Sequence, residues 1–533
     1  RLDADVYVPD AAGPFPVLLM RQPYGRASAA TVVYAHPNWY AAHGYVVIIQ
    51  DVRGRGSSEG EFCLFAHEVE DGYDTVEWAA HLPESNGQVG MYGFSYQGMT
   101  QLYAAQAQPA PLQALAPAMV GTDLYQDWAY ENGALRLQAG LGWAIQLAAE
   151  TARLKGDKTA FTALRAAARN LPLNDAVTAY PELMQRYAPD SFWHDWIAHP
   201  HDDDYWQSLT RRVLFRLLPM LHVGGWFDPY LTGNLRRYRE LTAKGSSPQH
   251  LRVGPWCHIP WHRKVGAVDF GAAAMNPIDA LQIRWFDQFL KGQDRGLLAE
   301  PAVQLFEMGS NQWRQIDHWP PTAKQQPYRL YSTGLAGMRE DDGILVTPGS
   351  TMRSPAQTDT LVHDPWRPVP ALGGHTSVPS GSFERSAIDG RSDVLTYTTG
   401  PLEQALEIAG SVAISLMITA DAPSFDISAV LSVLHPNQTV FNLTQGYGRF
   451  QQRDNQLQNK TPITLTLQPT CFRLSPDQAL RLSLSAACFP AYTVTPGTGN
   501  PLPDQVPTLD QRIITLTLHQ GKQTVLQLPV VSA

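Results

Sequence analysis

The sequence lacks the features that would assign it to membrane, nucleic-acid or metal-binding proteins. No apolar run approaches the roughly 20 residues that span a bilayer, so no membrane segment is predicted. The formal net charge is −9, from 40 basic against 49 acidic residues without a clustered basic stripe, which argues against a nucleic-acid partner. No spacing of His, Cys and Glu suggests zinc, and we expect neither a metal nor a cofactor.

Cysteine is also scarce, with four residues among 533. So few cysteines cannot build a disulfide scaffold. Cys471 and Cys488 would pair if they lay on neighbouring strands, but buried free thiols are the favoured interpretation. The sequence starts at Arg1 rather than at Met, which suggests that an upstream segment is missing. Because no signal peptide is visible, a cytoplasmic location is slightly favoured.

The chain is too long for one hydrophobic core, so two or three domains are expected. Residues 1–121 alternate short apolar runs rich in branched residues, such as 45–49, with helical stretches, such as 71–82. This alternation predicts a largely parallel sheet in an α/β domain. Strand signals vanish over residues 122–215, which predicts an inserted helical cap, and they resume in residues 216–326, the second part of the core.

Residues 327–533 have a different pattern. Pro, Gly, Ser and Thr separate many short alternating runs, for example 412–418, 463–467 and 512–519. Repeated short strands with turn signals between them predict a β-sandwich or a jelly roll. The predicted architecture is therefore an α/β core with a helical insertion and a C-terminal β domain.

The strongest local signal is the segment 93–98, Gly-Phe-Ser-Tyr-Gln-Gly, which we interpret as a nucleophile elbow of the G-x-S-x-G type. It follows a short apolar run and opens a helical stretch, which is the setting that such an elbow needs. The turn places Ser95 near a helix N-terminus, where the backbone N–H of Tyr96 can face a developing oxyanion. The alternative is a glycine-rich strand–helix turn with a bystander serine.

A nucleophilic serine needs a base, and the base needs an acid that orients it. On this fold the chain order is serine, acid, histidine. Asp228 and His258 satisfy this order, and each follows the end of a predicted strand, where open α/β sheets bind their ligands. Asp195 and the acidic run 202–204 are weaker candidates for the acid, because they fall in the helical insertion.

Two further loops follow predicted strands. The loop 21–25 is where the second oxyanion donor is expected, and the phenol of Tyr24 is the candidate. The alternative for Tyr24 is an aromatic residue that packs beneath the site. The glycine-rich loop 51–60 matches neither the P-loop pattern nor G-x-G-x-x-G, so we interpret it as a loop that braces the site rather than as a nucleotide site.

These segments together resemble the bacterial cocaine esterase and X-Pro dipeptidyl-peptidase group of serine hydrolases, over essentially the whole length. That group also contains α-amino acid ester hydrolases and glutaryl-cephalosporin acylases. The matching segments are 21–25, 51–60, 93–98, 225–230, 254–258, 284–287, 308–309 with Trp313, 364–365 with 372–374, and 488–490. The resemblance implies an α/β-hydrolase core with an inserted helical cap and a C-terminal jelly roll.

The resemblance also assigns roles to individual residues. It implies Ser95 as the nucleophile, His258 as the base and Asp228 as the acid. It implies that the Tyr24 O–H and the Tyr96 N–H form the oxyanion hole.

Two substrate contacts are implied in the same way. Trp143 corresponds to a cap tryptophan that lines the acyl pocket, and Tyr230 to an aromatic contact just past the acid, with core packing as the alternative for both. Residues 375–378 are more polar than the pocket segment of the family's cocaine esterase, so benzoyl-ester specificity is not expected. Gln97 is neutral where an amine-binding enzyme would favour a carboxylate. The run 202–204 would serve instead, unless it is a solvated helix cap.

We therefore expect a serine hydrolase that cleaves an ester or amide bond of a small molecule through an acyl-enzyme. The alternative is an α-amino acid ester hydrolase or X-Pro dipeptidyl aminopeptidase, which would require a free amine on the substrate. A non-catalytic module that binds carbohydrate through its β domain is disfavoured by the candidate triad. Assembly into a homo-oligomer is compatible with the sequence.

Overall fold

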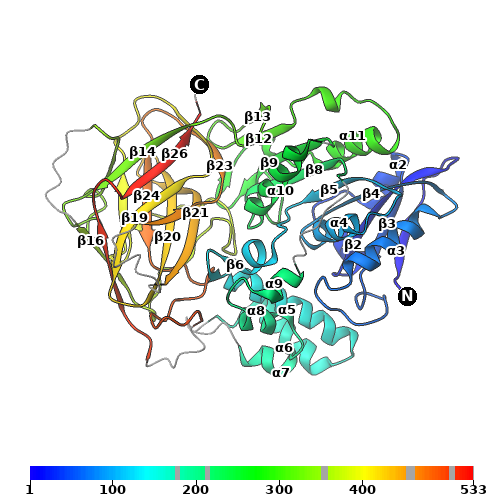
Figure 1. The fold of residues 1–533 in the computed structure, drawn as a ribbon, viewed down its shortest axis with the longest axis horizontal. Helices are drawn as coiled ribbons and strands as arrows, with labels where there is room; N and C mark the ends of the chain where they lie inside the picture. Colours follow the sequence, from blue (N-terminus) through cyan, green and yellow to red (C-terminus); the bar gives the residue numbers. More distant parts are fainter. Residues whose placement is uncertain are drawn as a thin grey trace.

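The computed structural model describes residues 1–173, 181–209, 217–245, 247–349, 358–451, 462–502 and 510–531. The N-terminal part is built on a nine-stranded sheet, and the C-terminal part consists mainly of strands. A helical segment is inserted between two strands of the first sheet (Figure 1). The predicted class, an α/β core followed by an all-β domain, is confirmed. The four-part division at residues 121, 215 and 326 stays a prediction, and its middle boundary lies outside the described residues.

The nine-stranded sheet has the order β1-β3-β2-β4-β5-β8-β9-β12-β13. Its inner neighbours run parallel, whereas the edge strands β1 and β13 pair antiparallel with theirs. The strands are β1 Ala4–Tyr7, β2 Phe15–Gln22, β3 Val46–Asp51, β4 Ser85–Phe94, β5 Leu112–Ala118, β8 Met220–Phe227, β9 Gln249–Cys257, β12 Val303–Glu307 and β13 Gln312–Ile316.

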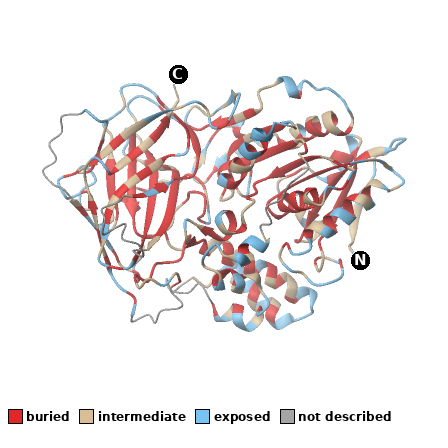
Figure 2. Ribbon diagram, viewed as in Figure 1, coloured by how far each residue is buried: buried red, intermediate tan, exposed pale blue. Residues whose placement is uncertain are grey.

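Helices cover both faces of this sheet, so its central strands are buried on both sides (Figure 2). Val17 and Leu19 of β2 belong to the core that holds α3 and α4, while Leu18 and Met20 belong to the core that holds α2 and α11. Successive side chains of a strand point to opposite faces, which is why apolar runs without polar alternation form these strands. The helices are α2 Pro37–Ala42, α3 Glu68–Ala80, α4 Tyr96–Gln106, α10 Leu231–Lys244 and α11 Ile278–Leu290.

The segment between β5 and β8 is mainly helical, as predicted. It contains a π-helical turn at Leu124–Ala129 and the helices α5 Leu137–Leu154, α6 Lys158–Arg169, α7 Glu182–Tyr187, α8 Phe192–Ala198 and α9 Asp204–Leu209. In Figure 1 these helices lie below the junction of the two larger parts. Residues 174–180 and 210–215 of this predicted insertion lie outside the described residues.

The first long helix of this segment, α5, starts only at Leu137, because Ala134–Leu135 (β7) forms a hairpin with Tyr130–Glu131 (β6). Its two-residue loop is Asn132-Gly133, and both residues have positive φ, 45° and 82°. Asn-Gly is the preferred loop of such a hairpin. The hairpin contacts the all-β domain, since Arg449 N–H donates to Asn132 O at 3.0 Å and Asn132 Nδ2 donates to Tyr447 O at 2.8 Å.

The C-terminal part is a set of mainly antiparallel strands, several of which alternate buried and more exposed residues as predicted. The strands are β14 Lys324–Tyr331, β15 Ile344–Val346, β16 Thr358–His363, β17 Leu395–Thr398, β18 Leu406–Gly410, β19 Ala413–Ala420, β20 Ser424–Leu434, β21 Val440–Gln451, β22 Ile463–Thr466, β23 Thr470–Leu474, β24 Ala479–Ser485, β25 Ile514–His519 and β26 Val525–Val530.

One hydrophobic core runs from the end of the nine-stranded sheet into the all-β domain. It includes Trp226 of β8, Phe306 of β12 and Ile408 of β18. Gln468 Nε2 donates to Trp226 O at 2.8 Å across this junction. Cys471 and Cys488 are buried free thiols, which confirms the favoured interpretation. None of the helices in the described ranges is both long and apolar enough to cross a bilayer.

Candidate active site

Ser95 occupies the turn between β4 and α4 with φ 59° and ψ −124°, a strained conformation for a residue with a side chain. Glycine is needed on both sides of this turn. A Cβ at Gly93 would lie 2.5 Å from Gln97 Cβ, and one at Gly98 would lie 3.0 Å from Val120 Cβ. The strict G-x-S-x-G spacing is not met, because Gln97 occupies the position of the second glycine. Its Oε1 accepts from the Phe94 N–H at 3.2 Å.

Helix α4, which begins directly after Ser95, presents a backbone N–H donor next to this residue. Gly98 and Met99 donate their N–H groups to Ser95 O at 2.8 and 3.0 Å. The Tyr96 N–H has no acceptor among the described residues, as expected for the first residue of a helix. The Tyr96 side chain, unlike its backbone N–H, has a partner: its hydroxyl donates to Glu68 Oε1 at 2.7 Å. Glu68 in turn pairs with buried Arg21 at 2.7 Å.

Asp228 and His258 meet at the ends of two neighbouring parallel strands. Asp228 follows β8 and is fully buried, and His258 follows β9. His258 Nδ1 lies 2.7 Å from Asp228 Oδ1, while the Tyr230 N–H donates to Asp228 Oδ2 at 3.2 Å. A Cβ at Gly225 would lie 2.3 Å from Trp256 O, so glycine allows the two strand ends to approach.

The imidazole lies next to the elbow. Its ring centroid is 5.6 Å from that of Phe94, the residue before Ser95, and 26% of the His258 side chain is exposed. Ser95 Oγ makes no hydrogen bond to His258 or to another described residue in this structure. Catalytic hydrogen bonds are often long in the absence of substrate and shorten in the complex.

Tyr24 lies against both the elbow and the helical insertion. Its hydroxyl accepts a hydrogen bond from Trp143 Nε1 at 3.1 Å, and its ring packs edge-on to Tyr96 with centroids 6.5 Å apart. Burial raises the pKa of Tyr24 to about 12, although the Trp143 hydrogen bond acts in the opposite direction. The phenol therefore keeps its proton at neutral pH and can donate it.

The two residues expected to contact substrate belong to one aromatic cluster. The Trp128 ring packs at a tilt against Tyr230, with centroids 4.3 Å apart, and its centroid lies 5.5 Å from that of Trp143. Tyr230 packs edge-on to His258 at 5.1 Å. Trp128 was not singled out from the sequence, because it lies on a π-helical turn without a motif. The sequence offered only its general abundance of aromatic residues, with 14 Trp, 21 Tyr and 18 Phe, as a signal.

A buried charged network joins this site to the all-β domain. Arg136 Nη1 donates to Pro229 O, directly after Asp228, at 3.1 Å, and Arg136 Nη2 pairs with Glu131 at 3.0 Å. Glu131 Oε2 also accepts from His375 Nε2 at 2.9 Å and from the Tyr492 hydroxyl at 2.6 Å. Burial would raise the pKa of Glu131, but its cationic partners and hydrogen bonds lower it to about 2. His375, which we expected to make the pocket polar, is thus held by Glu131.

The acidic run 202–204 and the glycine-rich loop 51–60 both make contacts within the chain. Asp203 accepts from the Tyr205 N–H at 3.1 Å at the start of α9 and pairs with His199 at 2.6 Å, as the helix-cap interpretation predicts. In the loop 51–60, Asp51 accepts from the Arg26 N–H at 2.7 Å and so braces the chain next to Tyr24. The described residues contain no group of His, Cys, Asp and Glu that could hold a metal ion.

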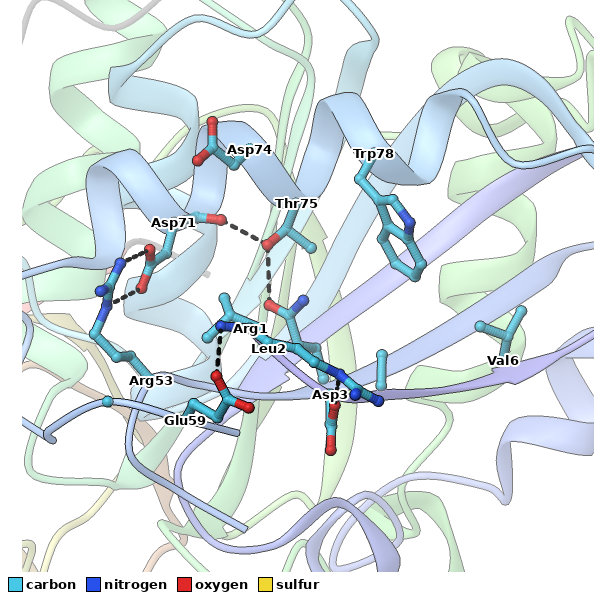
Figure 3. A pocket seen from close by; sticks show the side chains of 13 residues that line it. Arg1, Leu2, Asp3, Val6, Arg53, Glu59, Asp71, Asp74, Thr75 and Trp78 are labelled. Carbon is cyan, nitrogen blue, oxygen red and sulfur yellow. Dashed lines mark hydrogen bonds and ion pairs between the residues drawn. The ribbon is translucent and has the colours of Figure 1, made fainter. Parts of the chain in front are cut away.

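A separate hollow of about 720 Å³ lies at the start of the chain (Figure 3). Arg53 and Asp71 form an ion pair on one side of it, and Trp78 lies on another. None of the candidate catalytic residues lines it. It therefore has no place in the chemistry of Ser95.

Two family models match the chain. The model of X-Pro dipeptidyl-peptidase (S15 family) matches residues 1–260, and that of the X-Pro dipeptidyl-peptidase C-terminal non-catalytic domain matches residues 296–526. The cocaine esterase of Rhodococcus sp. (strain MB1 Bresler) is 32% identical over 529 residues, which cover 94% of this chain and 90% of that protein. A putative serine esterase of Mycobacterium bovis is 26% identical, over 86% of this chain and 81% of that protein.

Solved structures have the same fold. An aminopeptidase from a marine sediment archaeon, Thaumarchaeota archaeon, superposes with a TM-score of 0.79 at 22% identity, covering 100% of this chain and 94% of that chain. An α-amino acid ester hydrolase superposes with a TM-score of 0.78 at 21% identity, covering 99% and 94%. The resemblance noted in the sequence is confirmed: the chain belongs to the X-Pro dipeptidyl-peptidase (S15) family, together with the cocaine esterase, and is a serine hydrolase.

Proposed function

We propose that the chain hydrolyses an ester bond of a small acyl substrate through an acyl-enzyme on Ser95. His258 is the general base in this proposal, and Asp228 is the acid that orients it. The observation that carries the proposal is the 2.7 Å contact between Asp228 Oδ1 and His258 Nδ1, made beside the strained turn that presents Ser95. Ionised Asp228 keeps the proton on Nδ1, which leaves Nε2 free to act as the base.

The reaction begins when His258 Nε2 takes the Ser95 proton and Oγ attacks the substrate carbonyl carbon. The Tyr24 O–H and the Tyr96 N–H meet the negative charge that develops on the carbonyl oxygen. The imidazolium then protonates the leaving alcohol as its C–O bond breaks, and the acyl group stays on Oγ. A water molecule that gives its proton to His258 attacks this ester, and the acid leaves as the proton returns to Ser95.

An ester substrate without an amine fits the charges around the site better than an amine-bearing one. A buried substrate ammonium needs a carboxylate partner. The buried carboxylates near the site already have cationic partners, since Glu68 pairs with Arg21, Asp127 with Arg236, and Glu131 with Arg136. The residues that follow Asp228 are Pro229, Tyr230 and Leu231, which carry no charge.

Trp143 and Tyr230 are proposed to line the acyl group. Both belong to the aromatic cluster that reaches from Tyr24 to His258, and aromatic side chains suit an apolar acyl chain. Trp143 would have a second role, because its indole N–H occupies an acceptor position on the Tyr24 oxygen. The Tyr24 proton is then directed elsewhere, toward the substrate oxyanion.

A substrate panel tests the proposal. Wild-type protein should hydrolyse p-nitrophenyl butyrate, and Ser95→Ala should lower kcat by at least about 10³-fold. Methyl phenylacetate and phenylglycine methyl ester differ only in the amine, so their kcat/KM ratio separates an esterase from the amine-requiring alternative, with Gly-Pro-p-nitroanilide as the peptidase probe. A strong preference for the two amine-bearing substrates would replace this proposal with the alternative. Retained esterase activity in Ser95→Ala would refute the mechanism.

A further inference from the structure

Arg136 lies where the helical insertion meets the all-β domain. Its backbone directly precedes α5 and forms a β-bridge with Tyr492. The side chain is buried, and its Nη2 pairs with Glu131 at 3.0 Å. Burial disfavours the charge, but the acidic groups that face the guanidinium raise the pKa of Arg136 above its usual value. These groups are Glu131, Tyr492, Tyr230 and Asp127. The buried cation is therefore permanent at neutral pH.

The guanidinium contacts the peptide group that follows the candidate acid. Arg136 Nη1 donates to Pro229 O at 3.1 Å, and the Tyr230 N–H donates to Asp228 Oδ2 at 3.2 Å. The Pro229 C=O and the Tyr230 N–H are the two ends of one planar peptide group, and in a trans peptide they point in opposite directions. This peptide group thus lies between the guanidinium and the carboxylate, with a hydrogen bond at each end.

The hydrogen bond from the Tyr230 N–H fixes one of the two carboxylate oxygens of Asp228. Oδ1 contacts His258 Nδ1 at 2.7 Å, and in the described part of the chain the Tyr230 N–H is the donor to Oδ2. A carboxylate held at both oxygens cannot rotate, so its orientation determines that of the imidazole. Hydrogen bonds in a chain polarise one another. A cation at the Pro229 oxygen therefore strengthens the bond that holds Asp228.

We propose that Arg136 is a positioning residue of the hydrolase, which acts on Asp228 and His258 through the Pro229–Tyr230 peptide group. The inference rests on the proposed function, because it takes His258 as the base. The guanidinium orients Asp228 through the chain of hydrogen bonds. Its charge also disfavours the protonated imidazole, and the opposite charge of Glu131 offsets part of this effect.

The Arg136–Glu131 pair thus sets the pH above which His258 can accept the Ser95 proton. The titratable side chains that face His258 itself are Asp228 and Tyr230. Burial raises the pKa of Tyr230, so its phenol stays neutral near pH 7 and adds no charge there. A change of charge at the ion pair should therefore be visible in the protonation of the base.

Profiles of kcat/KM against pH, with p-nitrophenyl butyrate as substrate, test this role. The acid limb of such a profile reports protonation of the base in the free enzyme. Arg136→Gln and Glu131→Gln break the same ion pair, so a purely structural role predicts similar effects for both. The proposal predicts opposite ones: the midpoint of the acid limb should rise by about half a pH unit or more in Arg136→Gln and should fall in Glu131→Gln. Unmoved midpoints, or shifts in the same direction, would overturn the inference.

Two further variants separate geometry from charge. Arg136→Lys keeps the charge but not the planar fork that holds Pro229 O and Glu131 together, so it should lower kcat about tenfold and leave the midpoint near that of wild type. The double substitution Arg136→Gln/Glu131→Gln leaves no lone buried charge, and so decides the question even if a single variant does not fold. It should also lower kcat about tenfold. A wild-type kcat in the double variant would overturn the inference.

Arg385→Gln is the matched control, since it removes a buried arginine of the all-β domain that pairs with Asp389 at 3.0 Å. It should lower the Tm but change neither kcat nor the acid limb, and a limb that moves as in Arg136→Gln would overturn the inference. Hydrolysis that depends on Ser95 but has the same acid limb in all variants would reduce Arg136 to a structural brace and leave the proposed function intact. Hydrolysis that survives Ser95→Ala would instead remove the proposed function, and the inference with it.

Discussion

Replacing Glu131 with glutamine removes a buried negative charge that links the helical insertion to the all-β domain. Its partner Arg136 also contacts the backbone directly after Asp228. Glu131 Oε2 accepts from Arg136, His375 and Tyr492 in the folded chain. A pKa lowered from 4.5 to about 2 corresponds to about 3 kcal/mol of stability at neutral pH. Leaving Arg136 buried without its partner costs a comparable amount, roughly 3–5 kcal/mol. We expect Glu131→Gln to lower the free energy of unfolding at pH 7 by about 3 kcal/mol.

The sign of the pH dependence follows from the direction of this pKa. Because the pKa of Glu131 is lower in the folded chain than in the unfolded chain, its contribution is fully present above pH 4.5 and is lost as the pH falls toward about 2. The difference between wild type and Glu131→Gln should therefore narrow below pH 4.5. Both proteins lose stability from other groups on acidification, so the informative quantity is the difference between them.

Urea unfolding followed by tryptophan fluorescence, repeated from pH 7 to pH 3, measures this difference. The control is Glu150→Gln, which removes one partner of an ion pair with the half-exposed Arg153 and should cost no more than about 0.5 kcal/mol. A loss below about 1 kcal/mol for Glu131→Gln at pH 7, or a difference that does not narrow in acid, would refute the assigned role of this network.

Three other substitutions test the site itself. Asp228→Asn should lower kcat by about 10³- to 10⁴-fold with little change in the far-UV circular dichroism spectrum, because the uncharged amide cannot hold His258 in the required tautomer; a loss below tenfold would exclude Asp228 as the acid. Tyr24→Phe should lower kcat by about 10²- to 10³-fold, as expected for loss of an oxyanion donor. Trp143→Phe should cost about tenfold in wild type and almost nothing in the Tyr24→Phe background, since it acts through the Tyr24 hydroxyl. Equal costs of Trp143→Phe in both backgrounds, measured by steady-state kinetics, would show that this hydrogen bond has no catalytic role.

Much of the architecture could be predicted because its signals are local. Apolar runs such as residues 45–49 form strands of a sheet covered on both faces, and the alternating runs after residue 327 form the all-β domain. Asp228 and His258 were both placed at strand ends, and the parallel pairing of β8 with β9 brings them together. Chain order and position after a strand are properties that a sequence displays directly.

Other features depend on contacts between distant segments. His375 and Tyr492 contact Glu131, although they lie 244 and 361 residues away along the chain. No periodic pattern in the sequence predicts that such distant residues meet. The polar residue His375 was therefore assigned to the substrate pocket, although it binds a buried carboxylate. The hairpin at Asn132-Gly133 is different, because its loop carries a recognisable turn signal that the helical composition around it obscured.

Labelling with a fluorophosphonate, followed by intact-mass and peptide mass spectrometry, tests the central claim most directly. The proposed mechanism predicts one adduct per chain, formed by attack of Ser95 Oγ on phosphorus with loss of fluoride, and located on the peptide that contains Gly93 to Gly98. The adduct should be absent in Ser95→Ala and form much more slowly in His258→Ala. An adduct on another residue, or no adduct in a wild-type protein that hydrolyses esters, would contradict the assignment of Ser95 as the nucleophile.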